Sequence, residues 1–127
     1  MEGLGIVANV VAVVDLSLKV ISWCSKYAQD VKNSSDDRAR LLQAAITLHY
    51  ESGKVQGLLT NKRGAKLKAS RELVHQMGSS EVQLRDLCNL LSDKGNCFKW
   101  PLRKERAESA IRDIERLTKT LIEVLQN

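Results

Sequence analysis

Proline and aromatic residues are scarce in this sequence. It has one proline and seven glycines in 127 residues, and aromatic side chains make up 4% of the total although 43% are hydrophobic. Few residues therefore interrupt a helix, and the apolar side chains available for a core are mostly aliphatic. No segment has the alternating pattern of a strand, and no internal repeat is present. We expect residues 1–127 to form one all-α domain with a single core.

Cysteine and histidine are also rare, and their spacing contains no catalytic or metal-binding motif. The three cysteines, Cys24, Cys88 and Cys97, form neither a CxxC pair nor an even-numbered framework, which is typical of a reduced intracellular protein. His49 and His75 stand alone on predicted helices, without a cysteine or carboxylate placed as a second metal ligand. No HExxH, GxSxG or phosphate-binding loop motif occurs. We therefore expect no enzyme activity, no metal and no cofactor.

A long apolar stretch at residues 4–23 dominates the sequence. As a helix it measures about 30 Å, which is enough to cross the hydrocarbon core of a bilayer. Two charges within it, Asp15 and Lys19, are unusual in a constitutive membrane span. The stretch is therefore either a core helix of a soluble bundle, a membrane-active element, or each in turn.

A helical wheel divides this stretch near Asp15. Asp15, Lys19 and Lys26 fall in one band of about 100°, so the second half is an ordinary amphipathic helix. In the first half the same band contains only glycine, alanine and valine, and the helix is apolar on nearly every side. We predict that the part before Asp15 can leave the bundle and enter a membrane while the rest stays. The predicted insertion residues are Leu4, Ile6, Val7, Val10, Val11, Val13 and Val14.

Two acidic residues flank or interrupt the apolar half. Glu2 and Asp15 are costly in lipid unless they face water, so we expect them to line the lumen of an assembled pore.

Apolar residues at a spacing of three to four predict four helices, over residues 3–31, 35–61, 67–92 and 103–126. Short connections between them predict an up-and-down helical bundle, with the first helix deepest. Gly53 and Gly57 lie four residues apart in the second helix, where they are expected to allow close approach of a neighbouring helix. A connector with Phe98 and Trp100 is expected to pack against a helix end.

The chain is basic, with 20 Lys and Arg against 15 Asp and Glu, a formal net charge of +5. No recognition helix or base-stacking platform accompanies the basic residues, so we expect no nucleic-acid partner. Solvated bundle ends are one interpretation, and an anionic-lipid contact surface is the other. The predicted headgroup contacts are Lys62, Arg63, Lys66, Lys68, Arg103 and Lys104.

The N-terminus has no targeting signal. Glu2 is the only charge before the apolar run, where a secretory signal has Lys or Arg, and an Arg-rich transit peptide is absent. We expect a cytoplasmic protein that moves to a membrane when it is activated.

Both ends of the chain resemble a known family. The opening MEGLGIVANVVAVVDLSLKVISWCSKYAQDVKN, with Tyr27 and its "VK" exit, is similar to the N-terminus of fungal signal-transduction NTPases with NACHT and repeat domains. The Trp100-Pro101 connector before the last helix, and the phrases IERL at 114–117 and TKTL at 118–121, complete the resemblance. The whole chain thus resembles the HeLo-like N-terminal domain of these NOD-like receptors, and SesA-type domains are similar.

The resemblance implies a helical-bundle effector of regulated cell death. In such proteins downstream NTPase and repeat domains hold the bundle inactive, and homo-oligomerisation releases an N-terminal helix that permeabilises the membrane. Because the chain ends at Asn127, we expect it to be one domain of a longer protein. The alternative is a protein-interaction module that binds a partner and never contacts lipid.

Overall fold

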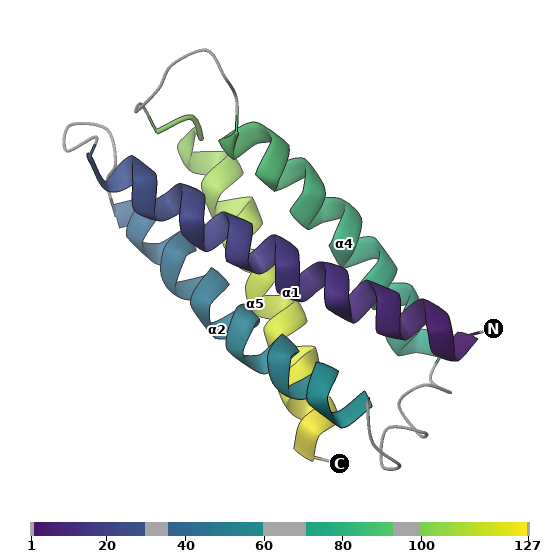
Figure 1. Cartoon of the computed structure of the whole chain (residues 1–127). Helices are drawn as coiled ribbons and strands as arrows, with labels where there is room; N and C mark the ends of the chain where they lie inside the picture. The colour runs from purple at the N-terminus through teal and green to yellow at the C-terminus, as the bar shows by residue number, and fades with distance from the viewer. Residues whose placement is uncertain (1, 30–35, 60–70, 93–99, 127) are drawn as a thin grey trace.

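The computed structural model describes residues 2–29, 36–59, 71–92 and 100–126, and its regular structure is helical throughout these ranges. Four long helices make up the fold, which confirms the predicted all-α bundle (Figure 1). They are α1 (Glu2–Lys26), α2 (Asp36–Leu59), α4 (Arg71–Leu91) and α5 (Lys104–Gln126), and the short 3-10 helix η1 (Tyr27–Gln29) follows α1.

The first helix ends earlier than the predicted residue 31, because the chain turns inward at Tyr27. This ring is buried, and its hydroxyl donates a hydrogen bond to the Leu91 carbonyl at the end of α4, at 2.5 Å. Arg38 of α2 donates a hydrogen bond to the Cys24 carbonyl at 3.2 Å, which satisfies one of the terminal acceptors of α1. Asp36 and Asp37 occupy the first turn of α2, where the helix dipole favours acidic side chains.

Successive helices reverse direction, but their order around the bundle is not the order in the chain. α1 packs against α2 on one side and α4 on the other, and α5 packs mainly against α2 (Figure 1). The order around the bundle is therefore α1, α2, α5, α4, so the consecutive helices α2 and α4 lie on a diagonal. α4 touches α5 far less than it touches α1, and this makes α1 the main support of α4.

The core is built from aliphatic stripes on all four helices. The largest fully buried side chains include Ile6 of α1, Leu41 of α2, Met77 of α4 and Leu121 of α5. The described side chains do not set the first helix apart as the deepest, because α1 buries no more of them than α2 or α5 does. Each helix of a four-helix bundle has two flanking neighbours, so one face of α1 remains open to solvent.

The two glycines of α2 do not mediate a close helix approach, contrary to prediction. A Cβ atom at Gly53 or Gly57 would meet no atom within 4 Å. The connector prediction is confirmed for its described part: Leu102 is buried, and the Trp100 ring packs edge-on against Tyr27 with centroids 5.7 Å apart. Phe98 and Cys97 lie outside the described residues.

Candidate membrane-active helix

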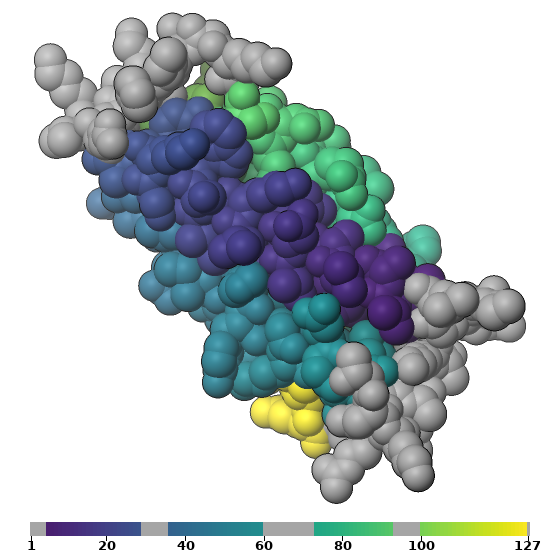
Figure 2. Space-filling model, in the orientation of Figure 1, coloured from purple at the N-terminus to yellow at the C-terminus, as the bar shows by residue number. Residues whose placement is uncertain are grey.

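Among the described residues, α1 is the one helix that is long and apolar enough to cross a bilayer. The most apolar 18-residue window of the stretch Gly5–Lys26 has a mean hydropathy of 1.8, and only 33% of that window is buried in the bundle. Figure 2 shows its side chains as a continuous band on the surface between α2 and α4. The most apolar helix of the protein is thus also one that solvent reaches along its length.

Two apolar seams run along α1, each with a spacing of three and four residues. The inner seam faces the core and consists of Ile6, Val10, Val13, Ser17, Val20 and Cys24, all fully buried. The outer seam consists of Val7, Val11, Val14, Leu18 and Ile21. Val11 and Leu18 of this outer seam are 44% and 51% exposed, and the other three are partly buried against the core. A helix with two such seams has more apolar surface than its two neighbours can cover.

The polar band of α1 lies beside the outer seam and begins at Asp15. The Asp15 carboxylate pairs with Lys19 at 3.3 Å, and both side chains are more than half exposed. Lys26 places its ammonium 4.7 Å from the centroid of the Trp23 ring, one turn back. The exposed ion pair of Asp15 and Lys19 contributes at most about 1 kcal/mol to the stability of the fold. The predicted division of the helix near Asp15 is therefore visible on its surface.

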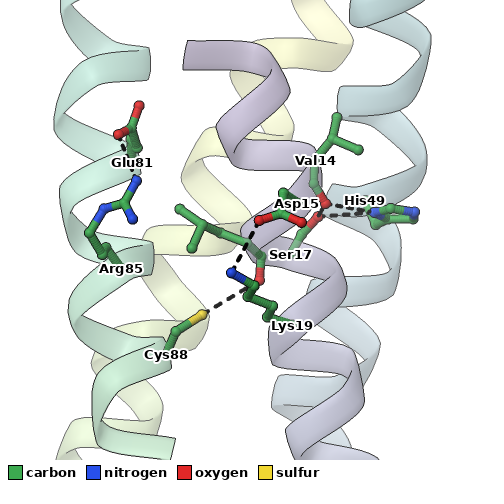
Figure 3. A network of polar contacts seen from close by, with 9 residues as sticks. Val14, Asp15, Ser17, Lys19, His49, Glu81, Arg85 and Cys88 are labelled. Atoms are coloured by element: carbon green, nitrogen blue, oxygen red, sulfur yellow. Dashed lines mark hydrogen bonds and ion pairs between the residues drawn. The ribbon is translucent and has the colours of Figure 1, made fainter. Parts of the chain in front are cut away.

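His49 of α2 ties α1 at the same level (Figure 3). Its Nδ1 atom lies 3.1 Å from the Val14 carbonyl and 3.1 Å from Ser17 Oγ. The Ser17 hydroxyl itself donates to the Val14 carbonyl at 2.9 Å. Because that carbonyl can only accept, Nδ1 of His49 must carry the proton and share it between both oxygens.

The remaining cross-helix hydrogen bonds of α1 lie further along the helix. The Cys88 thiol of α4 contacts the Leu16 carbonyl at 3.6 Å (Figure 3), and Arg38 and Tyr27 hold the C-terminal end. Within the described part of the chain, residues 5–13 form no side-chain hydrogen bond or ion pair. Apolar packing alone holds this half, whereas polar contacts fix the helix from Val14 onward.

The predicted insertion residues do not form a single surface. Ile6, Val10 and Val13 are fully buried, Val7 and Val14 are partly buried, and Val11 is exposed. The side chains of Glu2 and Leu4 lie outside the described residues. An all-round apolar segment thus places half of its apolar side chains in the core and leaves the other half at or near the surface.

Of the predicted headgroup residues, the two that the structure describes, Arg103 and Lys104, are separated from the apolar half of α1. Arg103 and Lys104 are exposed, but Arg103 precedes α5 and Lys104 begins it, close to Trp100 and Tyr27 at the C-terminal end of α1 (Figure 1). Lys62, Arg63, Lys66 and Lys68 lie outside the described residues. The structure therefore does not bring the described basic residues together with the N-terminal half of α1.

The thiols of Cys24 and Cys88 are buried core groups. Burial raises the pKa of Cys24 from 9.0 to about 12, and burial also raises the pKa of Cys88. No cluster of three His, Cys, Asp or Glu residues suited to a metal occurs within the described ranges.

His49 is the residue whose role sequence reasoning missed, since it was interpreted as an isolated helix histidine. A signal was present in Ser17, the only polar residue at an inner-seam position of the first helix. A buried hydroxyl requires a hydrogen-bond partner. The sequence nevertheless could not show which helix would supply the hydrogen-bond partner of Ser17.

A groove of about 610 Å³ lies between α2 and α5, on the side of the molecule away from α1. Apolar side chains of Ala44, Ile111 and Ile122 line it together with the charged Arg40 and Glu115. Besides the outer seam, this groove is a surface on which another protein segment has room to bind.

Comparison with protein-family models, curated proteins and solved structures gave no match for this chain.

Proposed function

We propose that this domain permeabilises membranes, by releasing the N-terminal half of α1 from the bundle and inserting it into an anionic bilayer. The observation that supports the proposal is the asymmetry of α1. Residues 5–13 are apolar apart from Asn9, partly exposed and without cross-helix polar contacts among the described residues, whereas polar contacts hold the helix from Val14 onward. The proposed trigger of this release is homo-oligomerisation, which downstream NTPase and repeat domains of a longer protein would regulate.

The free-energy cost of detaching residues 5–13 from the bundle is smaller than the cost of detaching all of α1. Detaching residues 5–13 exposes three fully buried side chains, Ile6, Val10 and Val13, at about 1.5–3 kcal/mol each. The hydrocarbon core restores that burial and additionally covers Val7 and Val11. The helical backbone satisfies its own hydrogen bonds, so within residues 5–13 the polar penalty of entering lipid comes from the Asn9 side chain.

Release of the whole helix would also disrupt the bundle. α4 packs mainly on α1 and only thinly on α5, where Gln76 Nε2 donates to Thr120 Oγ1 at 3.0 Å. If the second half of α1 stays, the Cys88 contact with the Leu16 carbonyl and the Tyr27 bond to Leu91 keep α4 attached. Release that stops near Asp15 therefore leaves a folded anchor behind.

A complete membrane crossing needs about 20 helical residues, more than the segment released up to Asp15 contains, so that segment reaches only part of the way through the bilayer and ends at Asp15. We propose that Asp15 and Glu2 face the water-filled lumen of the assembled pore, and that the basic segment around Lys62–Lys68, together with Arg103 and Lys104, contacts acidic headgroups. Asp15→Leu should then change the ion preference of the channels measured in planar bilayers. Unaltered conductance and ion preference would remove Asp15 from the lumen.

Dye release from vesicles tests the proposal with a matched pair of variants. Val11→Asp and Val82→Asp both replace exposed valines, 44% and 60% exposed, so neither should disturb folding. An Asp at the bilayer centre costs about 2.5–3.5 kcal/mol, so Val11→Asp should lower release from phosphatidylserine vesicles by about 100-fold, and Val82→Asp should not. Equal release by both variants, or none by the parent protein, contradicts the proposal.

The second candidate function is a protein-interaction module, which the groove between α2 and α5 favours. This function requires no lipid. A variant lacking residues 1–14 that stays folded and loses dye release supports the membrane proposal. Two results together support the interaction module. The parent protein never binds vesicles, and Ile122→Glu in the groove abolishes its cell-death activity in cells.

A further inference from the structure

We propose that the outer seam of α1 is the interface of a dimer, in which α1 of one copy packs antiparallel to α1 of a second copy. The outer-seam residues Val7, Val11, Val14, Leu18 and Ile21 are spaced by four, three, four and three residues. This spacing is the coiled-coil repeat, in which every apolar side chain of one helix inserts between side chains of a facing helix. In the monomer the most exposed members, Val11 and Leu18, have no such facing helix.

The adjacent surface of α2 extends the apolar area. The bond from His49 to the Val14 carbonyl fixes the register between the antiparallel helices α1 and α2. Leu18, one turn after Val14, therefore lies at the level of Ile46, and Ile21 at the level of Leu42. Ile46 is 43% exposed and Leu42 is partly buried against the core. The two helices together offer an apolar strip wider than one helix.

The outer seam is complementary to itself when two copies meet antiparallel. With a two-fold axis at the level of Leu16, Val14 packs against Leu18 of the second copy and Val11 against Ile21 of the second copy. The two-fold axis repeats each of these contacts, so every large seam residue except Val7 gains an apolar partner. Isologous two-fold contacts of this kind are the commonest form of protein dimer.

The charges beside the outer seam also favour a second copy over an unrelated helix. In this arrangement Asp15 lies within reach of Lys19 of the second copy, and Lys19 within reach of Asp15 of the second copy. The two exposed pairs, each 3.3 Å within one chain, thus combine into a cluster of two acids and two bases. The same two residues supply both signs, so one sequence provides both halves of the interface.

Light scattering coupled to size exclusion, without lipid, tests this inference independently of membrane activity. The mass should rise from 14.2 kDa toward twice that value between about 1 µM and about 300 µM, the range of small interfaces. Leu18→Glu should keep the protein monomeric throughout. Val82→Glu changes a more exposed residue of α4 outside the seam and should leave the dimer intact.

Charge reversal adds a test that does not depend on apolar substitutions. Asp15→Lys and Lys19→Asp should each weaken the dimer, and the double variant should restore it, because the exchange keeps the signs complementary. If Leu18→Glu fails to fold by circular dichroism, Val11→Lys replaces it. The inference is overturned if the parent protein stays monomeric over the whole concentration range, or if the dimer survives both seam variants. Either result leaves the proposed membrane activity standing, because dye release is measured separately.

Discussion

Replacing His49 with leucine should loosen the N-terminal half of α1 selectively. The imidazole Nδ1–H lies 3.1 Å from both the Val14 carbonyl and Ser17 Oγ, so one donor serves two acceptors and counts as about one hydrogen bond. A bond of this kind contributes about 1 kcal/mol, which corresponds to about a fivefold change in an equilibrium constant. An opening that includes Val14 breaks this bond, so His49→Leu should raise the population of the opened helix about fivefold.

Native-state hydrogen exchange measures that opening directly. The amides of residues 6–14 should exchange about fivefold faster in His49→Leu, and release of dye from phosphatidylserine vesicles should accelerate by a similar factor if opening limits insertion. His49→Asn is the matched control, because its side-chain amide supplies a donor near the position of Nδ1. Unchanged exchange over residues 6–14, or asparagine behaving like leucine, would refute the conclusion that this bond opposes an opening that includes Val14.

Three further predictions concern stability and thiol chemistry. Tyr27→Phe leaves the buried Leu91 carbonyl without its donor and should lower the free energy of unfolding by about 1–3 kcal/mol in urea titrations; an unchanged midpoint contradicts that role. Gly53→Ala adds a methyl group into open space within a helix and should raise the unfolding free energy by up to about 1 kcal/mol, whereas a lower melting temperature would show that the site is crowded. A pKa of about 12 leaves about 1,000-fold less thiolate on Cys24 at pH 8 than a pKa of 9.0, so iodoacetamide should label it only after denaturation or at strongly alkaline pH. Labelling of the folded protein at the denatured rate would refute the burial of this thiol.

The raised thiol pKa also gives a direction for stability at high pH. An unfolded cysteine loses its proton near pH 9.0, whereas Cys24 in the folded protein keeps its proton up to about pH 12. The unfolded state therefore binds fewer protons than the folded state between these values, and the free energy of unfolding falls as pH rises through that window. Below pH 9 this contribution is fully present.

The helices themselves follow from the sequence. The three-to-four spacing predicts four helices whose observed bounds differ from the predictions mainly at the ends, because helix ends depend on contacts that the local pattern does not contain. The early end of α1 is an example, since Tyr27 turns inward toward Leu91, which is 64 positions away. The change from an apolar to an amphipathic surface at Asp15 is likewise encoded locally, and the exposed pair of Asp15 and Lys19 agrees with it.

The tertiary structure decided which faces of these helices are covered. A periodic pattern identifies the face that one helix can bury, but the neighbour that buries it is fixed by packing over the whole chain. For this reason the sequence could not show that α1 lies between α2 and α4, that Val10 is enclosed while Val11 is open, or that His49 reaches the Val14 carbonyl. Composition and periodicity determined an aliphatic four-helix bundle with an unusually apolar first helix. The tertiary packing alone determined that polar contacts hold α1 from Val14 onward, and that apolar contacts hold the part before it.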